Sequence, residues 1–153
     1  MYTFKLQPVL DHRQLIEDNI KKELAEIRQK VIESQQQMES LKQKEMDTIR
    51  ALQQEQAQGL SSDQVVAYHV FLKDLSIRMD KQQRLIADIQ MQETAKQDEL
   101  LEAMKKRQIL EKLKDQGLDR YHQSVLKKEQ TFIDEIAVNQ FVRSTLSRNG
   151  DEE

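Results

Sequence analysis

The chain has 153 residues, of which 33% are charged and 5% aromatic, with three glycines, one proline and no cysteine. This composition is typical of long helices or coiled coils, because mixed globular folds need more turn residues. The net charge of −3 does not favour nucleic acid, and the lack of cysteine excludes disulfides and thiolate metal sites. The sequence has no apolar run of the roughly 20 residues that span a membrane and no signal-peptide pattern, so we expect a cytoplasmic protein.

A predicted helix over about residues 7–57 opens the chain. From Ile20 to Leu41 its apolar residues alternate at steps of three and four, and Ser34 fills one position of this heptad seam. Around Glu45 the spacing becomes four and four, which predicts a stutter that locally unwinds the supercoil.

A short hinge at about residues 58–62 follows this helix. Gly59 is suited to end the first helix, because glycine adopts the left-handed conformation without a steric penalty. Ser61, Ser62 and Asp63 are suited to cap the next helix, because their side-chain oxygens accept hydrogen bonds from free helix amides. A short link between two long amphipathic helices predicts an antiparallel two-helix coiled-coil hairpin in a single all-α domain.

The second helix is predicted over about residues 63–145, with a polar C-terminal tail over residues 146–153. Its apolar seam weakens where Glu93 and Lys96 take seam positions, which indicates either a flexible middle or charged side chains that extend outward from the seam. The seam is expected to resume at Leu100, Ala103, Leu110 and Leu113. Gly117 is compatible with a break, a kink or a tolerated glycine.

The second helix is expected to overhang the first. If the chain folds back near residue 60, the numbers of facing residues add up to about 120, so Leu6 faces roughly Lys114. Residues from about Gly117 to Arg143 then have no partner helix, yet they still carry an apolar stripe. We interpret this stripe as a docking surface for another protein, and the alternatives are that it folds back or pairs in a homodimer.

Motifs for nucleotide binding or catalysis are missing from the sequence. It contains neither a phosphate-binding loop nor a dinucleotide-binding glycine motif, and its three histidines lie far apart. Residues 105–128 hold eight basic and three acidic residues, a local charge of +5, which could guide the segment to an acidic partner or could be an ordinary solvated face. We therefore predict a protein that is not an enzyme and that has no catalytic, cofactor-binding or metal-binding residues.

Three stretches of the chain resemble the flagellar export protein FliJ family. Phe4 to Arg13 is similar to the family's opening F-x-L-x-x-V-L-x-x-R, and Tyr68 to Leu75 is similar to its Y-x-x-F-hydrophobic-x-x-L segment. Glu129 to Ala137 is similar to its ending E-Q-x-x-hydrophobic-D-E-hydrophobic-A. The three stretches occur in the family's order over nearly the full length.

The resemblance implies a stalk of the flagellar type III export apparatus, at the cytoplasmic face of the inner membrane. Its implied partners are the export ATPase FliI, the export gate protein FlhA and export chaperones, with no nucleic acid and no direct membrane insertion. The gate-contacting residues it implies are Tyr68, Phe71, Leu72 and Leu75, which alternatively close the hairpin seam. The ring-inserting residues it implies are Leu6, Leu10, Leu118, Tyr121, Val125, Phe132, Ile133, Asp134, Glu135, Ile136 and Phe141.

Other functions remain open at this stage. An injectisome-type secretion stalk would share the same architecture. A self-associating coiled-coil scaffold without an ATPase partner would use the same apolar overhang. A nucleic-acid-binding rod would use the basic stretch and would show steeply salt-dependent binding.

Overall fold

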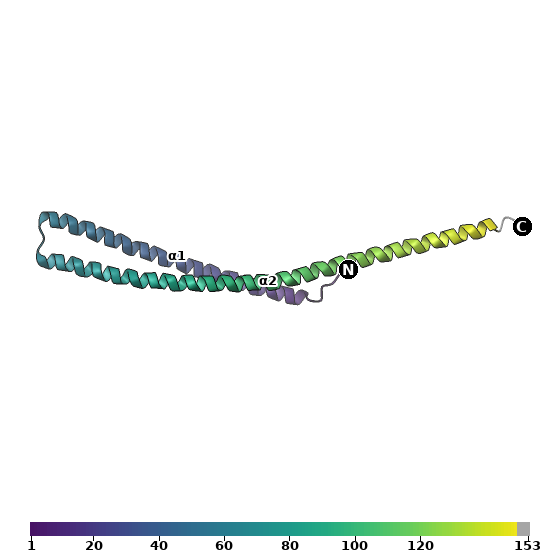
Figure 1. Cartoon of the computed structure of the whole chain (residues 1–153), viewed down its shortest axis with the longest axis horizontal. Helices are drawn as coiled ribbons and strands as arrows, with labels where there is room; N and C mark the ends of the chain where they lie inside the picture. Colours follow the sequence, from purple (N-terminus) through teal and green to yellow (C-terminus); the bar gives the residue numbers. More distant parts are fainter. Residues whose placement is uncertain (150–153) are drawn as a thin grey trace. The chain divides into compact units, whose positions relative to one another are not determined.

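The computed structural model describes residues 1–149, and within them the chain forms two helices and no strand (Figure 1). Helix α1 spans Gln7–Gln58 and helix α2 spans Ser62–Asn149. The predicted all-α hairpin with a longer second helix is confirmed. Helix α2 continues beyond the predicted end, so the predicted polar tail over residues 146–153 begins inside a helix, and its residues 150–153 lie outside the described part.

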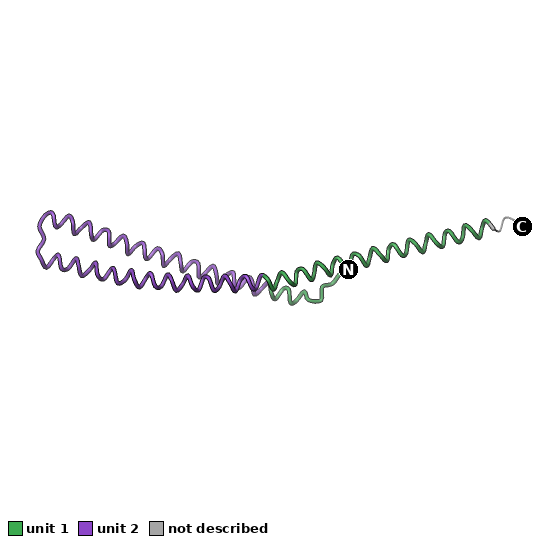
Figure 2. The backbone as a smooth tube through the Cα atoms, in the orientation of Figure 1, with its two compact units in different colours: residues 1–13, 105–153 green, residues 14–104 purple. Residues whose placement is uncertain are grey.

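Two compact units make up the chain (Figure 2). Residues 14–104 form one unit, and residues 1–13 together with residues 105–153 form the other. Both helices therefore contribute to both units. Within residues 1–149, neither helix has a stretch that is long and apolar enough to cross a membrane.

The hinge has the capping chemistry that its residues predict. Gly59 has a φ of 92°, a left-handed conformation that favours glycine, and its amide donates to the Gln56 carbonyl at 3.3 Å. The Gln64 amide donates to the Ser61 hydroxyl at 3.3 Å, and the Ser61 amide donates to Oε1 of Gln64 at 3.3 Å. This reciprocal pair is a capping box that pairs two otherwise free amides at the start of α2.

In the unit of residues 14–104, α1 and α2 lie side by side and antiparallel (Figure 1). Leu24, Val31 and Leu52 of α1 are buried, and Ser34 is buried at the seam position that the heptad assigns to it. The predicted stutter near Glu45 is wrong. Glu45 and Thr48 are both half-buried, which continues the steps of three and four to Leu52, whereas Ile49 is exposed.

The facing side of α2 buries Leu75, Ile86, Ile89 and Ala103. These residues also follow the heptad, since the half-buried positions between them fall at steps of three and four. Between Leu75 and Ile86, Gln82 adds a polar contact to the seam, because its Nε2 donates to the carbonyl oxygen of Ser34 at 2.8 Å.

The polar interruption of the seam is a layer of ion pairs between the helices. Arg28 Nε lies 3.3 Å from Glu93 Oε1, and Lys96 Nζ lies 2.7 Å from Glu23 Oε2 and 2.9 Å from Glu99 Oε2. The hydrogen bonds to Glu23 and then to Glu99 raise the pKa of Lys96. In both ion pairs that join the two helices, Arg28–Glu93 and Lys96–Glu23, the residue numbers add up to within one of the predicted sum of about 120. The fold-back near residue 60 is therefore confirmed.

In the other unit, α2 runs through Gly117 without a break. The first residues of the chain explain the glycine, because a Cβ at position 117 would overlap the phenol oxygen of Tyr2. The Met1 amino group donates to the Tyr121 hydroxyl at 2.9 Å, and the Tyr2 and Tyr121 rings lie 5.9 Å apart. We call residues 1–2 with Gly117 and Tyr121 the N-terminal clasp.

The apolar seam of this unit differs from the prediction at one position. Leu110 is half-buried as expected, but Leu113 is exposed, and the half-buried positions that follow Leu110 are Glu111 and Lys114. The preceding steps are four from Ala103 to Arg107 and three from Arg107 to Leu110, so the heptad continues with a step of four to Lys114 and not with a step of three to Leu113. Apolar character alone therefore did not identify the seam residue.

Candidate functional site

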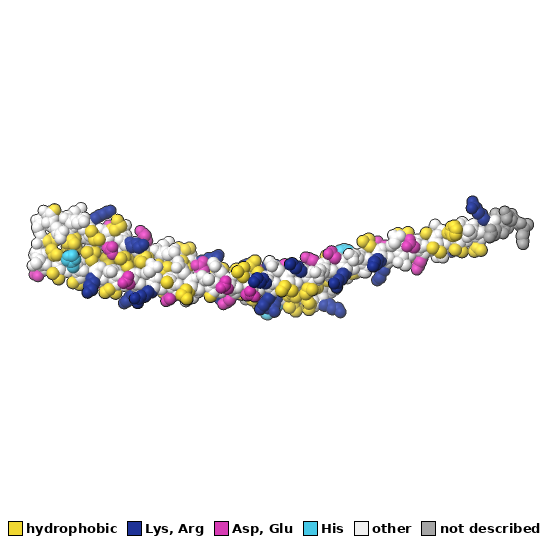
Figure 3. Space-filling view, viewed as in Figure 1, with side chains coloured by type: hydrophobic (Ala, Val, Ile, Leu, Met, Phe, Trp, Pro, Cys, Tyr) yellow, Lys and Arg dark blue, Asp and Glu magenta, His cyan; other side chains and the backbone are white. Residues whose placement is uncertain are grey.

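The end of α2 is an uncovered helix. Every residue from Leu126 to Arg148 is exposed in the structure, and we call this segment the overhang. Its large apolar side chains are at the surface, as the space-filling view shows (Figure 3). The most exposed of them are Leu126, Phe132, Ile133, Val138, Phe141 and Leu146. Such a series of uncovered apolar residues is unusual on a protein surface, so the overhang is a candidate interaction surface.

The N-terminal clasp shortens the overhang that the sequence predicted. Leu118 and Tyr121 were expected to lie in the unpartnered part of the helix, but Met1 and Tyr2 contact Gly117 and Tyr121. Tyr121 is half-buried, and Val125 beyond it is also half-buried. The sequence contained the signal, a helical glycine four residues before a tyrosine, but the partner is distant in sequence and its contact was not predicted.

The predicted ring-inserting residues fall into two groups. Phe132, Ile133, Ile136 and Phe141 all lie exposed on the overhang, together with Asp134 and Glu135. Leu10 is buried on α1, so it belongs to the packed part of the molecule, whereas Leu6 just before α1 is exposed. The overhang also exposes apolar residues that were not predicted as site residues, namely Val138, Val142 and Leu146.

At the hinge end of residues 14–104, the structure separates the predicted gate-contacting residues by burial. Leu75 is only 1% exposed and is therefore part of the core. Tyr68 and Leu72 are half-buried, whereas the Phe71 side chain is 46% exposed. Of the four residues, Phe71 is the one with the most surface available to a partner.

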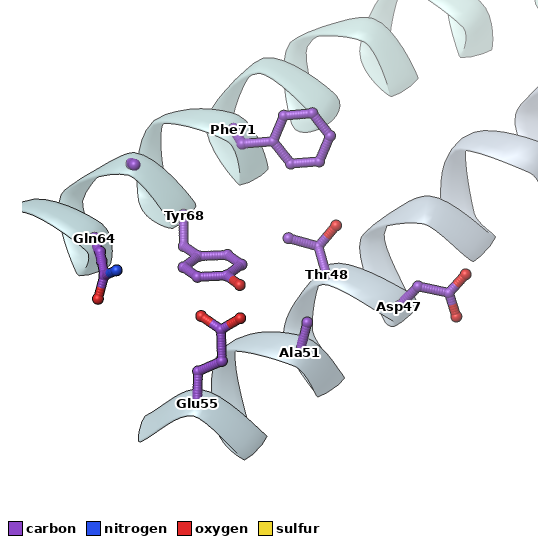
Figure 4. Close-up of a pocket in the computed structure, with 8 residues that line it drawn as sticks. Asp47, Thr48, Ala51, Glu55, Gln64, Tyr68 and Phe71 are labelled. Carbon is purple, nitrogen blue, oxygen red and sulfur yellow. The ribbon is translucent and has the colours of Figure 1, made fainter. Parts of the chain in front are cut away.

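Phe71 borders an open groove of about 550 Å³ between α1 and α2 (Figure 4). Tyr68 lies in the same groove and donates a hydrogen bond to the Glu55 carboxylate, which raises the pKa of Tyr68 above its ordinary value. The bond crosses from α2 to α1 and holds the phenol against the groove wall. The groove is thus lined by oriented aromatic side chains and is open to solvent.

The described residues offer little catalytic chemistry. His12, His69 and His122 are exposed, and no three histidine, cysteine or carboxylate side chains within residues 1–149 gather in a way that could hold a metal ion. What the geometry offers is surface for binding, at the overhang and at the groove.

Comparison with known proteins identifies the family. The family model described as "Flagellar FliJ protein" matches residues 2–146. The chain belongs to the flagellar FliJ protein family. This membership supports a role as a component of flagellar type III protein export.

A solved structure has the same fold. A putative YscO homolog, CT670 from Chlamydia trachomatis, is similar with a TM-score of 0.56 and 20% sequence identity over 100% of both chains. At this identity the likeness concerns the fold alone. No curated protein matches the chain in sequence.

Proposed function

We propose that this protein is the non-enzymatic stalk of the flagellar type III export apparatus, working at the cytoplasmic face of the inner membrane. In this proposal the overhang binds inside the ring of the export ATPase FliI and promotes its assembly or activity. The hinge end of the hairpin contacts the export gate protein FlhA, and export chaperones are further partners. Family membership supports the export role, and the uncovered apolar helix supports a protein partner at the overhang.

The distribution of apolar residues around the overhang is the observation that carries the ATPase contact. At 3.6 residues per turn, Val138 lies about 200° around the helix axis from Ile136. Phe141 likewise lies about 180° around the axis from Phe132, whereas Val142 and Leu146 turn back to within about 80° and 40° of Phe132. All of these side chains are exposed. A helix that is apolar on opposite sides needs a partner that surrounds it, and a central channel of a ring meets this need better than a flat surface.

The charge of the preceding segment is compatible with such an insertion. Residues 105–128 hold eight basic and three acidic residues, and the last three of these residues, 126–128, are the first residues of the overhang. Basic side chains at this place would steer the helix toward an acidic channel entrance and would raise the association rate more than the final affinity.

The direct test is the ATPase rate of the cognate FliI, titrated with this protein and with the variant Phe132→Asp/Ile136→Asp. We expect stimulation by the wild type and its loss in the variant, because two carboxylates would be buried without partners in the channel. Met91→Asp is the matched control, since Met91 is 72% exposed on the hairpin and receives the same kind of substitution. Equal stimulation by wild type and variant, with both helical by circular dichroism, would remove the overhang from the ATPase contact.

Self-association through the overhang is the second candidate, because the same uncovered apolar residues could pair between two copies. Sedimentation equilibrium separates the two functions. A dimer at low micromolar concentration that the Phe132→Asp/Ile136→Asp variant abolishes, together with no effect on FliI, would favour the scaffold. A monomeric wild type that stimulates FliI would favour the stalk.

A further inference from the structure

The main apolar side of the overhang begins under the N-terminal clasp. At 3.6 residues per turn, apolar and aromatic side chains of α2 fall within an arc of about 60° around the helix axis, namely those of Leu118, Tyr121, Val125, Phe132 and Ile136. We call this set the long stripe. Burial changes along it, because Tyr121 and Val125 are half-buried whereas Phe132 and Ile136 are exposed. A partner that grips this side of the overhang can extend its contact to Tyr121 only if that end of the stripe is uncovered.

The clasp covers the Tyr121 end of the long stripe with the first two residues of the chain. The Met1 amino group donates to the Tyr121 hydroxyl at 2.9 Å, and the centroids of the Tyr2 and Tyr121 rings are 5.9 Å apart. Beside the stripe, the Tyr2 phenol occupies the space that a side chain at Gly117 would need. Tyr2 is half-buried, so the closed clasp hides part of both rings from solvent.

The contacts of the clasp are weak enough to open. Its hydrogen bond lies at the surface, where water competes for both groups, and the Met1 side chain is fully exposed. Residues 1–4 are not helical and precede the turn that leads into α1. Terminal segments with few contacts open at a low cost in free energy. The open and closed forms therefore differ by an amount that the binding of a partner can reverse.

We propose that the clasp is an intramolecular competitor, in which Met1 and Tyr2 cover the start of the long stripe in the free protein and are displaced when a partner grips the overhang. The partner is the channel of the export ATPase ring, so the inference rests on the proposed function for the identity of the competitor. Opening extends the available apolar surface by about two helical turns, from Leu126 back to Leu118. The closed clasp lowers the apparent affinity for the ring in proportion to the fraction of open molecules.

A permanent anchor for the N-terminus is the alternative role of the clasp. In an anchor, loss of the Tyr2 ring would loosen the end of the hairpin and weaken the binding of the partner. In a competitor, the same loss uncovers Tyr121 and strengthens binding. The sign of the effect therefore separates the two roles.

Two variants of the full chain open the clasp from opposite sides. Tyr2→Gln removes the covering ring, and Gln is chosen because a small residue at position 2 would expose Met1 to removal by methionine aminopeptidase. Gly117→Ala leaves residues 1 and 2 unchanged and places a Cβ where the Tyr2 phenol lies. Tyr2→Phe is the control that keeps the ring pair. Gln116→Ala is the matched control for Gly117→Ala, because Gln116 is exposed on the same turn.

Fluorine NMR measures the clasp itself without the ATPase. The sequence contains three tyrosines, so the chain labelled with 3-fluorotyrosine gives three resonances, which Tyr→Phe variants assign. We expect Tyr2→Gln and Gly117→Ala to shift the Tyr121 resonance and Gln116→Ala to leave it in place. A Tyr121 resonance that neither opening variant shifts would overturn the proposal, because the clasp would then not be closed in solution.

A titration of the FliI ATPase rate tests the competition. Both opening variants should reach half-maximal stimulation at a concentration about fivefold lower than the wild type, the factor that one surface hydrogen bond of typical net strength corresponds to, and both controls should match the wild type. Added FliI should also shift the Tyr2 resonance of the wild type toward its position in Gly117→Ala. Half-maximal stimulation at an equal or higher concentration in the opening variants would overturn the competition and leave the stalk function intact. A FliI rate that neither the wild type nor any variant changes would refute the stalk function and the competition together.

Discussion

Truncation of Leu75 and truncation of Phe71 should have opposite consequences, although the two side chains are one turn apart. Leu75 is 1% exposed, so Leu75→Ala should remove a complete core side chain and lower the free energy of unfolding by about 2–5 kcal/mol. Phe71 is 46% exposed, and fully burying such a side chain contributes about 1.5–3 kcal/mol, so Phe71→Ala should lower stability by about 1 kcal/mol. Urea denaturation followed by far-UV circular dichroism measures both values.

Binding to the gate protein should show the reverse order. Phe71→Ala removes the exposed ring from the groove and should weaken FlhA binding while the hairpin stays folded. Leu75→Ala should affect binding only in proportion to the fraction of unfolded protein. Ile77→Ala is the control, because Ile77 is similarly exposed at 48% but does not line the groove. A loss of stability from Phe71→Ala as large as that from Leu75→Ala would refute the division between core and docking residue.

Three further predictions concern hydrogen bonds and the N-terminal clasp. Because the pKa of Tyr68 is raised, its bond to Glu55 stabilises the fold below the ordinary tyrosine pKa of 10.0, and this contribution is lost as the pH rises through the folded-state pKa. Glu55→Gln should therefore lower the pKa of Tyr68 in a spectrophotometric titration, and an unchanged value would exclude the bond. Gly117→Ala should displace Tyr2, because a Cβ overlaps its phenol oxygen, while the helix itself gains up to about 1 kcal/mol. Faster aminopeptidase cleavage of Met1 would report the displacement, and unchanged cleavage would contradict it. Lys96→Leu should raise the urea concentration at the midpoint of unfolding and make this midpoint less dependent on salt, because an apolar side chain replaces an ion pair at a seam position. A lower midpoint would show that the ion pairs of Lys96 stabilise the hairpin more than an apolar seam residue does.

Much of the fold is local and was therefore predictable. Gly59 and Ser61 carry their capping chemistry in their own side chains and backbone freedom, so the place of the hinge followed from sequence. The alternation of apolar residues by three and four set the seam as far as Leu41, even through Ser34. The seam was misread where a polar residue takes a seam position beside an exposed apolar one, as at Thr48 and Ile49, because apolar character there no longer follows burial.

The antiparallel helical hairpin and its unpartnered apolar end follow from the amino-acid sequence alone, because helix periodicity and hinge chemistry are properties of neighbouring residues. The division of Tyr68, Phe71, Leu72 and Leu75 between core and surface depends on the tertiary structure, since all four share one side of α2 and their burial is set by the opposing helix. The tertiary structure likewise places Tyr2 over Gly117 and brings Ala51 and Ala67, one from each helix, to the lining of one groove. These contacts join residues far apart in the chain, and their existence depends on the register in which the two helices pack.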